Sequence, residues 1–392
     1  MSSDTLRPGV SAPGADRVPA LDVARGLLII AVVLHHSLLL TMPRLLGVYG
    51  DGGPLEVATL LTTWGRPIRM PAFFFLSGLL SAGVLARGWR AVWESRTANL
   101  LFVYLLWSVP LLVLRAVTEH RPLEALDLLT HVAIAPISVW FLYALALYPL
   151  VTLAVRGREV PALVVALAVH LAVVHGAMVT WDSRLPSVAG HYVFYLLGVV
   201  AMQRRHTWWR EVGDLRLLLA AVVALTPPVV HLLTGRFHAP LTAAAGIAGI
   251  VVIIGGTQRV MARVRPDTSA AAVGDVLAEV GRRTLPIYLW HLVVLALWWW
   301  ALDGVLAVTG TDLDAWTELG LALLGAPVGV WCSLRLEDLT RHRAPWLYAR
   351  PRRRRAAGVS GPSTPAAASR RTPAPPPGRP RSRTRGSSAP PA

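Results

Sequence analysis

Apolar runs of about twenty residues recur along most of this chain and are separated by short polar stretches. A run of about twenty apolar residues is long enough to cross the hydrocarbon core of a bilayer as an α-helix. Such windows lie near residues 20–41, 67–86, 97–117, 134–154, 160–179, 187–202, 215–234, 239–256, 284–302 and 316–334. The pattern predicts an all-α integral membrane protein with about ten transmembrane helices in one bundle.

Composition agrees with this class and excludes two others. Of the 392 residues, 54% are hydrophobic and only 15% are charged, and the mean hydropathy is +0.52. Soluble domains carry about 25% charged residues, and disordered chains have low hydrophobicity. A soluble enzyme and a disordered chain are both excluded, and the lipid bilayer is the first partner that we expect.

Arginines in the connections predict how the helices are oriented. The connections after even-numbered windows hold Arg87, Arg90, Arg96, Arg156, Arg158, Arg204, Arg205, Arg210, Arg216, Arg259, Arg263, Arg265, Arg282 and Arg283. The connections after odd-numbered windows hold Arg44, Arg66, Arg115, Arg121, Arg184 and Arg236, and the last of them holds only acids. Since basic loops stay in the cytoplasm, we expect both termini there, in a multi-pass protein of the cell (plasma) membrane.

Both ends of the chain differ from the apolar body. Residues 1–18 are rich in Pro, Gly and Ser, and residues 350–392 hold eleven Arg and no acid. This tail supplies most of the net charge of +16, and its Pro, Ser and Ala cannot form a core. We expect disordered segments at 1–18 and 350–392 around a transmembrane domain at 19–340. Anionic lipid is the expected contact of the tail, and no nucleic acid is expected as a partner.

One short segment has a helical period but is not a span. In residues 270–282, Val273, Val276, Leu277 and Val280 recur at helical spacing. The spacing predicts an amphipathic helix along the cytoplasmic membrane surface.

The first window carries an unusual group of polar residues, Asp22, Arg25, His35 and His36. An ionisable residue at the centre of a membrane helix costs about 2.5 to 3.5 kcal/mol on insertion scales, so such groups need a reason. Arg25 and His36 are eleven residues apart, which places them on one helix face with about 16 Å between them along the axis. His35 points about 100° away and is the weaker candidate. Asp22 lies three residues before Arg25, a spacing at which opposite charges meet.

A simpler interpretation of the same residues stays open. Asp22 and Arg25 can pair at the cytoplasmic boundary, and both histidines can hydrogen-bond neighbouring helices. In the second window, the run from Arg69 to Gly78 places Ser77 near the middle of the membrane. Ser77 and Gly78 taken alone indicate a small-residue packing site between helices.

Four segments, taken in order, resemble a known family. Leu21-Asp22-Val23-Ala24-Arg25-Gly26 followed by His36 is similar to the Arg, ten residues, His signature of the membrane-bound acyltransferase 3 family, which includes polysaccharide O-acetyltransferases. Met70-Pro71 with Phe73 to Gly78 resembles its Phe-rich, Ser-Gly motif. Trp140 to Leu145 resembles its Trp-Phe-Leu segment, and Thr284 to His291 its late Tyr-Leu-x-His segment. The resemblance covers residues 16 to 340, without the hydrolase-like extension of some members.

The resemblance implies an activity and a set of roles. It implies acyl transfer, of acetyl above all, from acetyl-CoA or another acyl-CoA to a hydroxyl of a carbohydrate or similar acceptor. His36 is then the general base, because imidazole titrates near physiological pH. Arg25 holds the donor or orients the site, Asp22 fixes Arg25, and Ser77 donates a hydrogen bond. An acyl-enzyme at Ser77 stays an open alternative.

Further candidates bind substrates. The phosphates of a cytosolic acyl-CoA favour the basic connection that holds Arg87, Arg90 and Arg96. Side chains of the two later matching segments are candidates for substrate binding, namely Trp140, Tyr143, Tyr288 and His291. For His291, a satisfied core histidine is an equally good interpretation. The other histidines show no metal-ligand spacing, so no metal is expected.

Two other classes of protein compete with the enzyme. A proton-coupled exporter could use Asp22, Arg25 and the histidines as a relay. A membrane scaffold could act through its basic tail. Only the enzyme needs a thioester donor.

Overall fold

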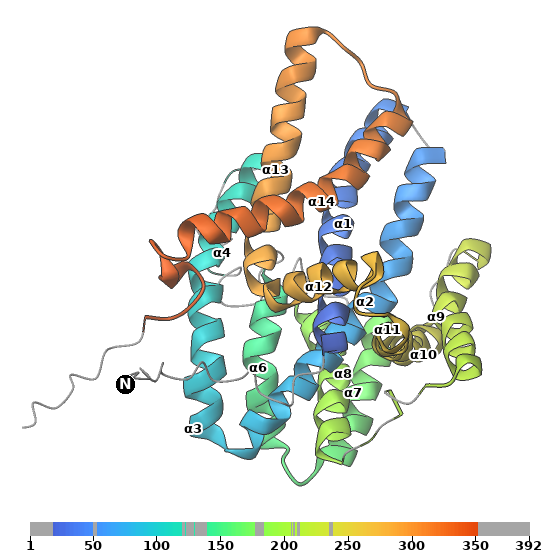
Figure 1. The fold of residues 1–392 in the computed structure, drawn as a ribbon, viewed down its shortest axis with the longest axis vertical. Helices are drawn as coiled ribbons and strands as arrows, with labels where there is room; N and C mark the ends of the chain where they lie inside the picture. Colours follow the sequence, from blue (N-terminus) through green and yellow to red (C-terminus); the bar gives the residue numbers. More distant parts are fainter. Residues whose placement is uncertain are drawn as a thin grey trace, which may run out of the picture. The chain divides into compact units, whose positions relative to one another are not determined.

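The computed structural model describes residues 19–49, 53–119, 139–176, 184–204, 212–234 and 238–351, with Pro122, Leu129, His206, Trp208 and Trp209 between them. Every regular element in this part of the chain is a helix (Figure 1). The predicted disordered segment at 1–18, and the predicted tail beyond Pro351, lie outside the described residues. The helical elements of the described residues confirm the predicted all-α class.

The helices follow the predicted windows in order. The long elements are α1 (Pro19–Tyr49), α2 (Gly53–Ala86), α4 (Ala98–Thr118), α8 (Leu185–Gln203), α9 (Asp214–Thr234), α13 (Thr284–Thr309) and α14 (Ala315–Thr340). The shorter ones are α3 (Trp89–Val92), α6 (Trp140–Ala154), α7 (Glu159–Val174), α10 (Ala239–Ile250), α11 (Gly256–Arg263) and α12 (Ser269–Arg282). Single π-helical turns, η1 (Trp93–Thr97) and η2 (Val251–Gly255), join α3 to α4 and α10 to α11.

Eight of the described helical stretches are long and apolar enough to cross a membrane. The two shorter apolar helices α6 and α7 fill the fourth and fifth predicted windows. Part of the fourth window, residues 134–138, lies outside the described residues. The chain is thus a multi-span membrane protein. Over the described residues it has eight helical stretches that are long enough to span and two shorter apolar helices, where about ten spans are predicted.

Helices α1 and α2 are longer than the apolar windows that predict them. The first window ends near 41 and the second begins near 67, whereas α1 continues to Tyr49 and α2 begins at Gly53. Backbone hydrogen bonding continues past the point where side chains become polar, so hydropathy places the end of α1 too early and the start of α2 too late. Arg44 consequently lies within α1, where it pairs with Glu318 of α14 and with Asp303 of α13. The acids of the last connection thus neutralise a cation of the first helix.

Helix α12 confirms the predicted helix at 270–282 and packs crosswise against α1 (Figure 1). The contact is made by glycines: a Cβ on Gly26 would lie 2.1 Å from the Leu277 carbonyl oxygen, and one on Gly281 would lie 1.8 Å from the Asp22 carbonyl oxygen. The backbones therefore touch directly. The packed face is the small-residue face of α12, while Val273 and Val276 remain exposed.

Helices α2 and α8 meet in the same way. A Cβ on Gly78 would lie 2.1 Å from the Tyr195 carbonyl oxygen, and one on Gly198 would lie 2.1 Å from the Phe75 carbonyl oxygen. Small residues allow such close approach between membrane helices. The packing interpretation of Gly78 is confirmed, and this contact fixes the depth of the Phe-rich run in α2.

We predict that Gly78→Ala destabilises the protein, whereas Gly83→Ala in the same helix does not. The first methyl group has no room against α8, which costs about 1 to 3 kcal/mol for overpacking. The second meets nothing within 4 Å, and alanine favours a helix by about 1 kcal/mol over glycine. Thermal unfolding of the purified protein in detergent measures both. Equal melting temperatures for the two variants would contradict the packing described here.

Candidate active site

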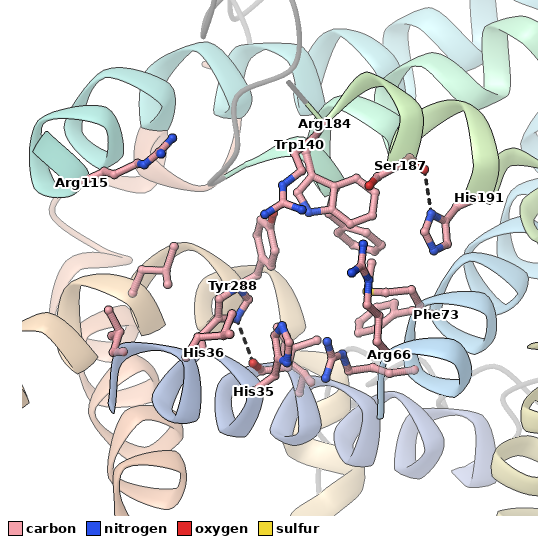
Figure 2. A pocket seen from close by; sticks show the side chains of 18 of the residues that line it. His35, His36, Arg66, Phe73, Arg115, Trp140, Arg184, Ser187, His191 and Tyr288 are labelled. Carbon is pink, nitrogen blue, oxygen red and sulfur yellow. Dashed lines mark hydrogen bonds between the residues drawn. The ribbon is translucent and has the colours of Figure 1, made fainter. Parts of the chain in front are cut away.

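Two cavities open along one face of α1, and each contains one of its predicted functional residues. The larger, here called the His36 cavity, has a volume of about 470 Å³ (Figure 2). The smaller, called the Arg25 cavity, has a volume of about 150 Å³. The helical period of α1 therefore places both side chains on the side of the bundle that is hollow, as their eleven-residue spacing predicts.

The two cavities share a wall. Ile29, Phe73, Phe141 and Tyr288 line both of them. The rings of Phe73 and Phe141 meet edge to face at 5.0 Å, and Phe141 lies 5.6 Å from Tyr288. Four residues from four helices thus lie between the surroundings of Arg25 and those of His36.

His36 forms a pair with His291 of α13. Its Nδ1 lies 2.9 Å from the Val32 carbonyl oxygen and 3.3 Å from Nε2 of His291. Nδ1 of His291 in turn lies 2.7 Å from the Tyr288 carbonyl oxygen. A carbonyl oxygen only accepts, so Nδ1 carries the proton in both rings. Nε2 of His291 is then an acceptor for His36, and Nε2 of His36 keeps a lone pair.

Arg25 is held by its own helix and by α13. Its Nη1 lies 3.5 Å from Oδ1 of Asp22, and its Nη2 donates to Oγ1 of Thr284 at 3.0 Å. The predicted pairing with Asp22 is present. Thr284 is an additional partner that sequence spacing does not reveal, because 259 residues separate it from Arg25.

Ser77 lines the Arg25 cavity rather than the His36 cavity. Its hydroxyl donates to the Phe73 carbonyl oxygen at 2.9 Å, a bond within α2. The proton is therefore directed at the backbone of its own helix. A serine nucleophile needs a base at this position, and the Phe73 carbonyl does not serve as one.

The three arginines predicted to bind the donor lie in different surroundings in the structure. Arg96 lies in the π-helical turn η1 and lines the Arg25 cavity. Arg87 is exposed, and the side chain of Arg90 is 83% exposed and pairs with Glu94 at 2.8 Å. Neither Arg87 nor Arg90 lines either cavity. Of the three, only Arg96 lies beside Arg25, and it does so in a π-helical turn, an irregularity that is frequent at functional sites.

The substrate-binding candidates of the two later matching segments differ in whether they line a cavity. Trp140 and Tyr288 line the His36 cavity, and Trp140 lies 5.6 Å from the His191 ring. Tyr143 packs against Tyr104 with ring centroids 5.4 Å apart and lines neither cavity. His291 is fully buried and contacts two residues of the cavity lining, His36 and Tyr288.

Sequence reasoning missed the basic lining of the His36 cavity. Arg66, Arg69, Arg115 and Arg184 all line it. Figure 2 labels three of them, Arg66, Arg115 and Arg184, which the sequence suggested only as markers of helix orientation. The available signal was Arg69, a charge inside an apolar window. His35 was also undervalued, because it lines this cavity beside His36.

A third cavity, of about 490 Å³, adjoins the His36 cavity. The two share His35, Leu39, Arg66, Ser187 and His191. Threonines contribute to the rest of its lining, namely Thr59, Thr62, Thr63 and Thr242. Over the residues that the structure describes, no group of three or more His, Cys, Asp or Glu side chains could hold a metal ion.

Comparison with known proteins identifies the family. A family model described as an acyltransferase domain matches residues 18–337. No curated protein and no solved structure matches the chain significantly. The match covers most of the chain and includes all four segments on which the resemblance rests. The chain belongs to the acyltransferase 3 family and is a multi-pass membrane acyltransferase.

Proposed function

We propose that this protein transfers a short acyl group, acetyl above all, from a cytosolic acyl-CoA to a hydroxyl of a carbohydrate or similar acceptor across the cell membrane. One observation carries the proposal. Arg25 and His36 lie on one face of α1 in two cavities that share a single wall of side chains. A donor site and an acceptor site on opposite sides of a membrane need such an arrangement.

The Arg25 cavity suits the end of the donor. Its two cations, Arg25 and Arg96, lie among apolar side chains of α2, α4, α6 and α13. With about 150 Å³ it has room for a thioester and a short acyl group, while the nucleotide stays outside at the cytoplasmic surface. Asp22 and Thr284 hold Arg25 in place, and Ser77 contributes a hydroxyl group to the lining of this cavity.

The His36 cavity suits the acceptor. Its volume of about 470 Å³ falls in the range of about 300 to 1,000 Å³ that is usual for small-molecule sites. Trp140 and Phe141 offer apolar faces, and the third cavity adds room for a larger acceptor. Nε2 of His36, with its lone pair, is the base.

The reaction balances without a cofactor beyond the donor. The acceptor hydroxyl loses its proton to Nε2 of His36 while its oxygen forms a bond to the thioester carbonyl carbon. The tetrahedral intermediate collapses and the C–S bond breaks. The leaving sulfur takes the proton from the His36 imidazolium, so coenzyme A leaves as the thiol and the base is regenerated. The imidazolium of His36 is stabilised through Nδ1–H by Val32 and by Nε2 of His291. His291 is thus a positioning residue.

The wall between the cavities is where the two substrates meet. Ile29, Phe73, Phe141 and Tyr288 can move apart by rotation of their side chains, without motion of a helix. The acyl carbon then reaches the acceptor while coenzyme A stays on its own side. A proton-coupled exporter, the alternative function, gains no support from membership in an acyltransferase family.

Replacement of His36 tests whether its imidazole is the general base of acyl transfer. We predict that His36→Ala lowers acyl transfer by about 10²- to 10⁴-fold, the usual contribution of a general base. Label transfer from radioactive acetyl-CoA to membrane and envelope fractions measures this, with His342→Ala at an exposed position as the control. Transfer at the normal rate by the His36 variant would exclude this base.

Replacement of His291 tests whether it accepts the Nδ1–H of His36. We predict that His291→Ala lowers kcat by about tenfold, because the imidazolium of His36 loses an acceptor worth about 1.5 kcal/mol. His291→Gln keeps an acceptor oxygen and should recover part of the rate, with the KM of both substrates unchanged. Equal loss in both variants would show that His291 only fills space.

Replacement of Arg25 tests whether the acyl-CoA donor binds in the Arg25 cavity. We predict that Arg25→Gln weakens acyl-CoA binding by about 10- to 100-fold, the range for a lost hydrogen bond to a charged group. Binding of acetyl-CoA to the purified protein gives the dissociation constant, and Arg335→Gln on exposed α14 surface is the control. An unchanged dissociation constant would place the donor elsewhere.

A further inference from the structure

The His36 cavity is lined by more cationic than acidic side chains. Among its described lining residues are four arginines and one acid, Glu119. Glu119 is already paired, because its Oε1 accepts from Nε of Arg115 at 2.7 Å. The other arginines come from two places in the fold, Arg66 and Arg69 from α2 and Arg184 from the residue before α8. Figure 2 shows Arg66 and Arg184 around the same space as Tyr288 and the two histidines of α1.

Arg69 is the most informative of them. It is 6% exposed and lies in a span. Its Nη1 donates to the Ala31 carbonyl oxygen at 3.2 Å, and its Nε is buried without a hydrogen-bond partner among the described residues. In the same part of the chain neither Arg69 nor Arg66 forms an ion pair with a carboxylate. Removing one partner of a buried ion pair is strongly destabilising, so a buried cation without a counter-ion calls for an anion.

An anionic group on a ligand in this cavity would balance these cations. Structural cations elsewhere in the fold show the contrast: Arg44 and Arg283 are each held by two carboxylates of α13 or α14. Arg66 and Arg69 face the cavity instead. Guanidinium groups recognise planar carboxylates and phosphates through paired hydrogen bonds.

We propose that the acceptor is an acidic carbohydrate, and that Arg66 and Arg69 bind its carboxylate or phosphate while one of its hydroxyls lies at Nε2 of His36. The inference rests on the proposed function only in assigning this cavity to the acceptor. It names the class of acceptor that the reaction consumes. It also gives Arg69 a role in specificity that a merely structural arginine would lack.

Three sugars that differ only at C6 test the proposal: glucose, glucuronate and glucose 6-phosphate. Their binding to the purified full-length protein in lipid nanodiscs is measured by calorimetry, without turnover. We expect at least one acidic sugar to bind about tenfold or more tightly than glucose, and this preference to weaken as salt rises. The better acidic sugar identifies carboxylate or phosphate as the recognised group.

Variants assign the preference to the two arginines. Arg66→Gln and Arg69→Gln should each remove it while leaving glucose binding unchanged, and Arg69→Lys should restore part of it. Arg265→Gln removes one charge at an exposed position between α11 and α12 and should keep the preference. Because Arg66 is exposed at the cavity, its variant remains informative if the Arg69 variant does not fold.

Two results would overturn the proposal. One is that neither acidic sugar binds more tightly than glucose, whether or not the protein transfers acyl groups. The other is that the Arg66 and Arg69 variants lose affinity for acetyl-CoA rather than for the sugars, which would assign the cavity to the donor. Loss of acyl transfer from every acceptor with the sugar preference intact would instead count against the proposed function alone.

Discussion

The helical period of α1 is the constraint on which the site depends. Eleven residues return an α-helix to almost the same face, so Arg25 and His36 face one side of the bundle at two depths. Gly26 fixes that face, because its backbone packs directly on α12 and leaves no freedom for α1 to rotate. Both cavities open on this face.

The surrounding helices convert that face into two chambers. The Phe-rich run of α2 is fixed in depth by Gly78 against α8, and it contributes Phe73 to the wall and Ser77 to the smaller cavity. Helix α13 supplies Thr284 to Arg25 and His291 to His36. One helix thus supports both functional groups of α1, and its Tyr288 lies in the wall between them.

Sequence reasoning succeeded where a period or a spacing decides the outcome. The apolar windows gave the helices, and eleven residues gave the shared face of Arg25 and His36. It failed where contacts join distant segments: the partner of His36 is 255 residues away, and the basic lining combines α2, α4 and the start of α8. Hydropathy could not place the ends of α1 and α2, because a helix continues beyond the apolar core of a bilayer. Counting the arginines of the connections for orientation also gave no indication that Arg66, Arg115 and Arg184 line one cavity.

A structure of the protein with a non-hydrolysable thioether analogue of acetyl-CoA tests the assignment of the two cavities. We predict that the pantetheine end enters between Arg25 and Arg96, with the acetyl-like group against the wall of Ile29, Phe73, Phe141 and Tyr288. His36 would then lie on the other side of that wall, facing a cavity still open to an acceptor. An analogue whose phosphates bind at Arg66 and Arg69, or whose acyl end lies away from this wall, would contradict this assignment of the cavities.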